Sequence, residues 1–281
     1  MRRGLVLAGG GVAGIAWELG VLCGLGDVDT ELQSGVIAAD VIVGTSAGSA
    51  VAAQVASGTA IDTLYAAQLD EVSNEIEVDV DFEDLMTRFV AAAGGAQGAE
   101  DMRRRIGALA LDTPTVSEAV RRAVIAARLP DPSWPDRTLL VTAVDAHSGE
   151  LTVFTRESDV ELADAVAASC AVPGVWPPVT IGGHRYIDGG VRSGTNADLA
   201  VGCERVLVIT PSQADAPQPW GSLDDEIHQL EPAAVHVIFA DVASTAAFGT
   251  NPLSPAVRGP SARAGRAVGR AAAADLAAFW R

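Results

Sequence analysis

The pentapeptide Gly44-Thr45-Ser46-Ala47-Gly48 constrains the fold more than any other segment of this chain. It follows the apolar residues 41–43 and opens an alanine-rich stretch, which predicts a strand, a sharp turn and a helix. In that context a G-x-S-x-G sequence is typical of a nucleophile elbow, whose serine has a strained backbone. Gly44 and Gly48 are expected to be glycines because a Cβ there would collide with the neighbouring strand and helix. Ser46 is therefore predicted at the edge of a sheet and at a helix N-terminus, whose dipole favours negative charge.

A second glycine-rich segment, residues 9–14, follows the apolar residues 5–7 and precedes a helical pattern. Three consecutive glycines allow the backbone to pass close to a ligand and leave N–H groups free to face an anion. We interpret this segment as an oxyanion hole for acyl transfer. Its donors would be the amides of Gly10 and Gly11, together with that of Ala47 after the nucleophile.

The same segment also matches another motif. Gly9, Gly11 and Gly14 have the G-x-G-x-x-G spacing of a dinucleotide-binding turn after a strand. Nucleotide binding would require an acidic residue at the end of the second strand. The next clear strand, residues 41–43, leads into the serine elbow instead, so the oxyanion hole is the favoured interpretation.

A third segment, Tyr186-Ile187-Asp188-Gly189-Gly190, puts a carboxylate at a strand end before two glycines. These three segments, in this order, resemble the patatin-like phospholipase family. Asn196 and the residues leading to Asp188 (168–173, 176–179 and 182–188) also look like the family pattern. The resemblance covers roughly residues 4–210. It departs from the pattern at Ala13, where the family commonly has Arg or Lys.

The resemblance implies an α/β fold, a three-layer α/β/α sandwich with a mixed, mainly parallel central sheet and a helical cap insertion. The alternation of strand and helix patterns along the chain independently implies a sheet covered on both faces. We expect a single catalytic domain over residues 1–281. The cap would span about residues 60–130, and a C-terminal strand–helix extension about residues 232–281.

The resemblance also implies a Ser46–Asp188 catalytic dyad acting on lipids or other carboxyl esters, as a phospholipase, lysophospholipase or esterase. Asp188 would accept the Ser46 proton, which requires a partly desolvated site because a carboxylate is a weak base in water. No metal or other cofactor is expected. The glycines expected to shape the elbow and the loops are Gly9, Gly14, Gly44, Gly48 and Gly189.

Two alternatives stay open at this point. A Ser-His-Asp triad needs a histidine after the acid, and of the four histidines only His228 and His236 follow Asp188. His228 lies in a polar segment and His236 in an apolar strand, so a surface and a core role are simpler interpretations. The other alternative is a low-activity lipid-binding or regulatory protein on the same fold, to which Ala13 points.

Charge and composition narrow the partners. The net charge is −17 at pH 7, which disfavours nucleic acid and anionic membranes. No run approaches the length of a transmembrane helix, and the three cysteines have no metal or redox spacing, so we expect a cytoplasmic protein. Residues 262–280 predict a C-terminal helix that packs on the domain, although transient contact with a membrane or micelle surface stays open. Nothing in the sequence indicates an oligomeric state.

Three smaller expectations concern the connecting segments. The acidic residues between 70 and 84 are predicted to be a solvated surface of the cap rather than a metal site. Thr115 and Glu118 have the spacing of a capping box at a helix start. The Pro-rich residues 214–220 predict a surface loop.

Overall fold

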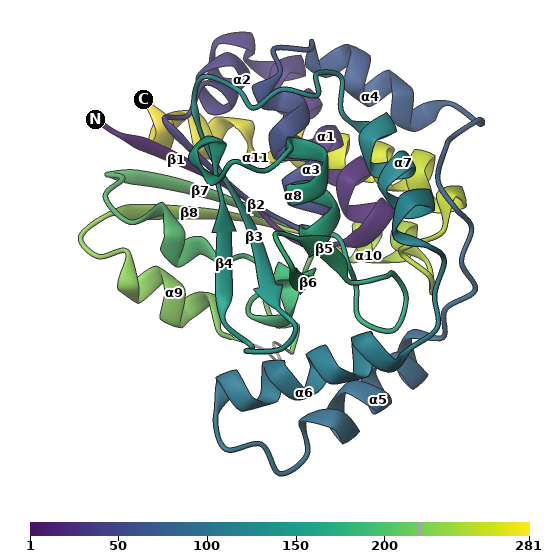
Figure 1. Ribbon diagram of the computed structural model, residues 1–281. Coiled ribbons are helices and arrows are strands. Elements are labelled where there is room, and N and C mark those ends of the chain that lie inside the picture. The colour runs from purple at the N-terminus through teal and green to yellow at the C-terminus, as the bar shows by residue number, and fades with distance from the viewer. Residues whose placement is uncertain (218–220) are drawn as a thin grey trace.

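The computed structural model describes residues 1–217 and 221–281, so the predicted loop at 214–220 lies partly outside the described residues, at 218–220. An eight-stranded sheet has the order β5-β6-β3-β2-β1-β7-β8, with β4 paired to β3 (Figure 1). The strands are β1 (Arg3–Leu7), β2 (Val41–Thr45), β3 (Thr138–Asp145), β4 (Leu151–Phe154), β5 (Val179–Ile181), β6 (His184–Asp188), β7 (Arg205–Thr210) and β8 (Ala234–Phe239).

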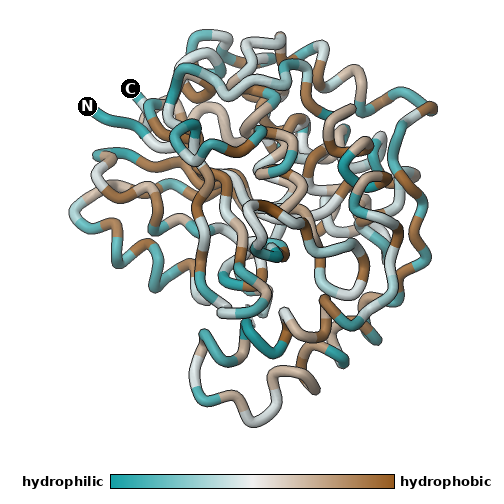
Figure 2. The backbone as a smooth tube through the Cα atoms, viewed as in Figure 1, coloured by the Kyte–Doolittle hydropathy of each residue, from teal (hydrophilic) through white to brown (hydrophobic). Residues whose placement is uncertain are grey.

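The sheet is mixed and mainly parallel. Strands β3, β2, β1, β7 and β8 run parallel to one another, while β4 and β6 pair antiparallel to β3 and β5 pairs antiparallel to β6. The central strands are buried on both faces, which explains their nearly continuous apolar sequences. Figure 2 shows this as brown and white central strands, whereas the outer helix α9 (Leu223–Gln229) alternates between brown and teal.

Alternating side chains of the strands face two different helical layers. Leu5, Leu7 and Ile42 belong to a core with the helices of one layer, whereas Val6 and Val43 face the other. The first layer contains α1 (Gly11–Val28), α2 (Thr30–Ile37), α3 (Ala47–Ala56), α4 (Ile61–Leu69), α7 (Glu118–Arg128), α8 (Leu162–Ser169), α10 (Val242–Phe248) and α11 (Arg258–Trp280). The second contains α9 and the short 3-10 helix η3 (Ala197–Ala200). The fold is a three-layer α/β/α sandwich, as expected.

Helices α5 (Phe82–Ala93) and α6 (Ala99–Asp112) lie apart from both layers, beyond one end of the sheet (Figure 1). Leu85, Phe89 and Ile106 form a separate small core with Val144 and Ile187, at the ends of β3 and β6. The segment predicted as a cap, about residues 60–130, is therefore mostly helical, but α4 and α7 within it belong to the first layer and only α5 and α6 lie apart. Its standing as an insertion into one domain remains a prediction.

The C-terminal helix α11 packs along α1, as predicted, through glycines on both helices. A Cβ on Gly265 would lie 2.1 Å from the Trp17 carbonyl oxygen, and one on Gly20 would lie 2.2 Å from that of Ala262. Only a hydrogen at these positions allows the two backbones to approach so closely. Among the described residues, α1 is the one helix long and apolar enough to cross a membrane, although the sequence predicted no such segment; most of it is buried inside the protein.

Two local expectations differ from the structure. Helix α7 begins at Glu118 with Ser117 as its N-cap, whose Oγ accepts from the Val120 amide at 3.3 Å, so the capping box predicted at Thr115 is wrong. The acidic stretch is mostly exposed but not entirely. The Glu75 side chain is largely buried and pairs with Arg128 at the end of α7. The two carboxylate oxygens accept from Nε and Nη2 of the guanidinium, an arrangement that compensates for the lost water.

Candidate active site

The turn between β2 and α3 holds Ser46 in a backbone conformation that residues other than glycine rarely adopt, with φ 51° and ψ −116°. Neighbouring side chains fix this backbone. The Ser46 amide donates to Ser169 Oγ at 2.9 Å, while its carbonyl accepts from Ser49 Oγ at 2.7 Å and from Cys170 Sγ at 3.2 Å. Hydrogen bonds to both the amide and the carbonyl of Ser46 therefore stabilise its strained backbone.

The two glycines of the pentapeptide are required by close approach. A Cβ on Gly44 would lie 2.5 Å from Ser49 Cα, and one on Gly48 would lie 2.0 Å from the Leu7 carbonyl oxygen. The Gly48 amide also donates to the Ala8 carbonyl at 2.9 Å, which ties the elbow to the end of β1. The elbow expected from the sequence is thus present in backbone form, with its glycines at the crowded positions.

The glycine-rich loop lies beside the elbow. The Gly9 amide donates to the Gly194 carbonyl, and the Gly14 amide to that of Gly10. Within the described residues, the amides of Gly10, Gly11 and Ala47 donate to no protein acceptor, since each stands at the start of α1 or α3. Free donors at two helix N-termini create a local positive potential next to Ser46.

Ala13 occupies the position where the family pattern commonly has a basic residue. Its side chain is fully buried in α1, and its amide donates to the Pro252 carbonyl at 2.9 Å. A Cβ on Gly11, which has φ +65°, would lie 2.7 Å from a Leu253 side-chain carbon. In this chain the segment around Pro252 and Leu253 therefore anchors the loop through the backbone and through packing.

The strand register brings Asp188 close to Ser46. Strand β3 pairs with β2 so that Thr142 lies opposite Thr45, and with β6 so that Ala143 lies opposite Asp188. Because β6 runs antiparallel to β3, its carboxyl end returns to the point where β2 ends. The last residues of β2 and β6, which are distant in sequence, thus lie at the same end of the sheet, one on each side of β3.

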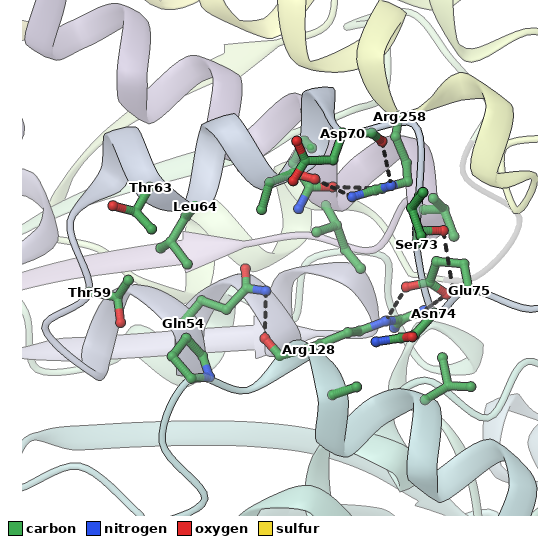
Figure 3. A pocket seen from close by; sticks show the side chains of 18 residues that line it. Gln54, Thr59, Thr63, Leu64, Asp70, Ser73, Asn74, Glu75, Arg128 and Arg258 are labelled. Carbon is green, nitrogen blue, oxygen red and sulfur yellow. Dashed lines mark hydrogen bonds and ion pairs between the residues drawn. The ribbon is translucent and has the colours of Figure 1, made fainter.

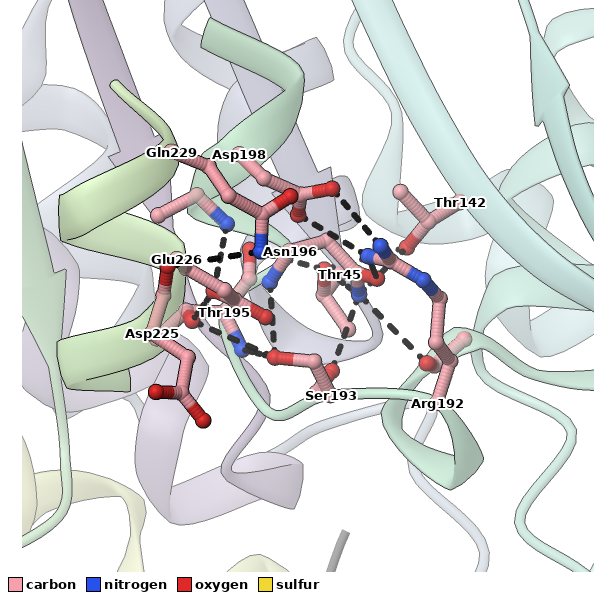
Figure 4. A network of polar contacts seen from close by, with 12 residues as sticks. Thr45, Thr142, Arg192, Ser193, Thr195, Asn196, Asp198, Asp225, Glu226 and Gln229 are labelled. Atoms are coloured by element: carbon pink, nitrogen blue, oxygen red, sulfur yellow. Dashed lines mark hydrogen bonds and ion pairs between the residues drawn. The ribbon is translucent and has the colours of Figure 1, made fainter. Parts of the chain in front are cut away.

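A buried polar network fixes the loops that follow these strands (Figure 4). Asn196 has φ 50° and is fully buried, and its Nδ2 donates to Thr45 Oγ1 at 3.0 Å and to the Ser193 carbonyl at 2.8 Å. Arg192 donates to Asn196 Oδ1 at 2.7 Å and forms an ion pair with Asp198. The residue preceding the elbow serine and the loop after Asp188 are therefore held by one amide.

Asp188 is buried, with 5 % of its surface exposed. Its Oδ1 accepts from the Gly190 amide at 2.7 Å, whereas its Oδ2 has no hydrogen-bond partner among the described residues. Burial raises the pKa of Asp188 to about 7, against the opposing effects of the Ser46 side chain, the Gly190 amide and the Arg121 charge. The carboxyl thus changes its protonation state near neutrality, as an effective proton acceptor requires.

A cavity of about 420 Å³ opens over these groups. Gly9, Gly10, Gly11, Ser46 and Asp188 line its floor. Its walls are mainly apolar and come from several segments: Phe82, Phe89, Val172, Val191, Phe248 and Leu253. A polar floor under apolar walls suits a ligand with one reactive polar group on an apolar chain.

The structure brings the predicted serine, aspartate and glycine loop together, but none of the four histidines lines this cavity in the described part of the chain. His184 is exposed and contacts Asp145 at 2.9 Å, and His147 lies in the turn after β3. On α9, His228 Nδ1 lies 2.6 Å from the Asp224 carbonyl oxygen. On β8, the ring of His236 packs near that of Phe279 from α11. Asp188 is therefore the carboxyl group that lines this cavity together with Ser46.

The sequence did not single out three charged residues beside the site. Arg121 and Arg128 project from α7 and Glu75 from the acidic stretch, and all three are largely buried. A signal was present, because Arg121, Val124, Ile125 and Arg128 have the spacing of one helix face. An arginine on the core-facing side of an amphipathic helix indicates a buried charge that needs a partner.

Known proteins that resemble this chain include one sequence family and two solved structures. Residues 5–201 match the family described as Patatin-like phospholipase. Among solved structures, VipD from Legionella pneumophila is 14 % identical with a TM-score of 0.40, over 88 % of this chain and 53 % of VipD. The type III effector protein ExoU is 19 % identical with a TM-score of 0.44, over 98 % of this chain and 53 % of ExoU. The chain thus spans about half the length of these two proteins. No curated protein matches it.

Proposed function

Because this chain belongs to the patatin-like phospholipase family, we propose that it is a serine acyl hydrolase that cleaves carboxyl esters of lipids. The observation that carries this proposal is the pairing of a strained, buried serine with a carboxyl whose pKa is raised to about 7, under an apolar cavity. The family supports hydrolysis of lipid esters in general. The dyad, the oxyanion hole and the ester class below are our proposal.

Acylation begins when Ser46 Oγ attacks the ester carbonyl carbon. Asp188 takes the hydroxyl proton, directly or through water, as the C–O bond forms. The amides of Gly10, Gly11 and Ala47 donate to the negative oxygen of the tetrahedral intermediate. Stabilisation of this oxygen by fixed donors usually makes the largest single contribution to the rate enhancement. The intermediate then expels the alcohol, which leaves with the proton held by Asp188.

Deacylation repeats these steps with water. A water molecule gives a proton to Asp188 and attacks the acyl carbon, and the same amides hold the second oxyanion. The Ser46 oxygen leaves with that proton as the carboxylic acid forms, so the enzyme returns to its starting state. The apolar walls at Phe82, Phe89 and Phe248 suit the acyl chain, because apolar contact area favours its burial.

The test is hydrolysis of p-nitrophenyl esters of increasing chain length by the wild type, Ser46→Ala and Asp188→Asn. We expect both variants to lose activity by a factor on the order of 10³ or more, since each removes a group that acts in the transition state. The matched controls are Ser57→Ala, at the opposite end of α3 from Ser46, and Asp136→Asn on the surface. Both controls should keep activity.

Circular dichroism verifies that each variant is folded. Activity that survives in folded Asp188→Asn would contradict the dyad and direct attention to the histidines. Absence of turnover on every ester, together with no labelling of Ser46 by a fluorophosphonate, would favour a binding protein on this fold.

A further inference from the structure

Arg121 on α7 is a buried cation whose charge lowers the pKa of Asp188 and which has no other part in the proposed mechanism. The residue is 5 % exposed, and its Nε and Nη1 have no hydrogen-bond partner among the described residues. The guanidinium carbon lies 3.7 Å from the centre of the Trp176 ring, which stabilises the charge on one face. Such a group is costly to bury, because its N–H donors have lost water without gaining acceptors.

The nearest carboxylate is already engaged by another arginine. Glu75 accepts from Arg128 Nε at 2.7 Å and from Arg128 Nη2 at 2.6 Å. Arg121 Nη1 lies 3.9 Å from Glu75, within ion-pair range but too far for a hydrogen bond. Burial lowers the pKa of Arg121 only to about 10, so it stays protonated at neutral pH. Two cations share one anion, and this cluster carries an excess positive charge.

Arg121 lines two cavities, and the smaller of them reaches the nucleophile. Arg121, Ser46, Ala47 and Gly11 line one small cavity of about 10 Å³, which is room for a single oxygen-sized group. That cavity shares Gly11, Ser46, Val172 and Leu253 with the apolar cavity over the active site. A ligand at Ser46 can therefore place an apolar chain on one side and a single anionic oxygen on the other.

The small cavity also shares residues with a third cavity, which is rich in polar side chains and is shown in Figure 3. They share Val12, Ile15 and Arg128, and the polar cavity has a volume of about 370 Å³. Gln54 and Glu75 project into the region shown, and Gln54 Oε1 is buried without a hydrogen-bond partner among the described residues. The cavity beside Arg128 is thus lined by many hydrogen-bonding side chains, in contrast to the apolar walls around Phe82 and Phe89.

We propose that Arg121 forms an anion subsite for the alcohol portion of the substrate, so that the preferred esters carry a phosphate or carboxylate beside the scissile bond. The acyl chain occupies the apolar cavity, and an oxygen of the anionic group reaches the free N–H donors of Arg121. This inference rests on the proposed hydrolase function and specifies its substrate class. It assigns to a side chain of α7 a positive charge that the glycine loop, with Ala13, does not supply.

The experiment compares three esters with the same acyl chain: monodecanoylglycerol, its phosphate monoester, and the decanoyl ester of glyceric acid. The enzymes are the wild type, Arg121→Gln, Arg121→Lys and the control Arg122→Gln, which removes a half-exposed arginine from the adjacent position of the same helix. We expect the wild type to prefer one or both anionic esters. In Arg121→Gln, kcat/KM for the anionic esters should fall about 10- to 100-fold more than for the neutral ester, mainly through KM.

Arg121→Lys should keep part of the preference, and Arg122→Gln should keep all of it. The ester that loses most identifies phosphate or carboxylate as the anion. A wild type without preference, or an Arg121→Gln variant that loses all three activities equally through kcat, would overturn the subsite and indicate a structural or general electrostatic role.

A binding measurement separates this inference from the proposed function. Calorimetric titration of folded Ser46→Ala with the phosphate monoester should show binding that the added Arg121→Gln change weakens at least 10-fold. Binding unaffected by Arg121→Gln would refute the subsite even if the wild type hydrolyses esters. Binding that depends on Arg121, in a wild type that hydrolyses none of the three, would instead support the subsite and contradict the hydrolase.

Discussion

Asp188 shows how burial turns an ordinary carboxyl into a group that titrates near neutrality. In the unfolded chain an aspartate ionises near pH 4, whereas burial raises the pKa of folded Asp188 to about 7. Between these values the folded protein holds a proton that the unfolded chain has released. The free energy of unfolding therefore contains a contribution from Asp188 that is fully present below about pH 4 and is lost as pH rises through about 7.

Asp188→Asn should remove this contribution, because an amide does not ionise. The free energy of unfolding of the variant, relative to the wild type, should increase by roughly 2 to 3 kcal/mol between pH 5 and pH 8. Urea denaturation followed by circular dichroism at the two pH values measures the difference. The exposed Asp136→Asn is the control and should show no such change. An identical difference at both pH values for Asp188→Asn would mean that the carboxyl already ionises below pH 5.

The helix pair α1 and α11 is held together by backbone contact rather than by large side chains. Gly20 and Gly24 on α1 face Gly265 and Gly269 on α11, and a Cβ at any of the four would lie within 2.2 Å of a carbonyl oxygen of the other helix. Since α1 begins at the glycine loop, its placement against α11 also positions the proposed oxyanion donors. Packing far from the cavity is thereby coupled to the geometry of the loop.

Gly269→Ala should destabilise the protein by about 1 to 3 kcal/mol, because its Cβ would lie 2.1 Å from the Val21 carbonyl oxygen and the helices would have to separate. Gly259→Ala is a control on the same helix, since its Cβ would meet only the mobile end of Arg263 at 3.3 Å. That control should be neutral or stabilising by up to about 1 kcal/mol through helix propensity. Thermal unfolding of both variants decides the matter, and equal midpoints would argue against tight backbone packing.

Across the whole molecule, one hydrophobic core extends from Leu5 on β1 to Trp280 at the end of α11. Both ends of the chain thus contribute to the same interior, and the C-terminal segment is packed into it through α11 and paired to the sheet through β8. The smaller core of α5 and α6 contacts β3 and β6 through Val144 and Ile187. This arrangement supports the proposal that residues 1–281 form one domain with the cap inserted into it.

If so, calorimetry should record one unfolding transition, with equal calorimetric and van't Hoff enthalpies. The physical reason is that unfolding α11 would expose α1 and the central strands together. A separate transition that disappears on deletion of residues 82–112 would show instead that α5 and α6 form an independent unit.

The sequence by itself determined the elements that local chemistry specifies. The pentapeptide around Ser46 predicted a strand, a turn and a helix, because only glycine fits beside such a turn, and the apolar strands predicted a sheet buried on both faces. The glycines at 9–11 predicted a loop with free amides for the same reason. Asp188 was identified through its place in a familiar order of motifs, since an aspartate before two glycines has no distinctive chemistry of its own.

Only the tertiary structure decided what surrounds these groups. The position of β2 and β6 on either side of β3, the hydrogen bond from Asn196 to Thr45 at the end of β2, and the burial that raises the pKa of Asp188 all depend on contacts between residues distant in sequence. The same holds for Arg121, whose charge reaches the cavity at Ser46 because α7 packs there. Local propensity fixes a turn within a few residues, whereas burial and electrostatics are sums over the whole packed chain.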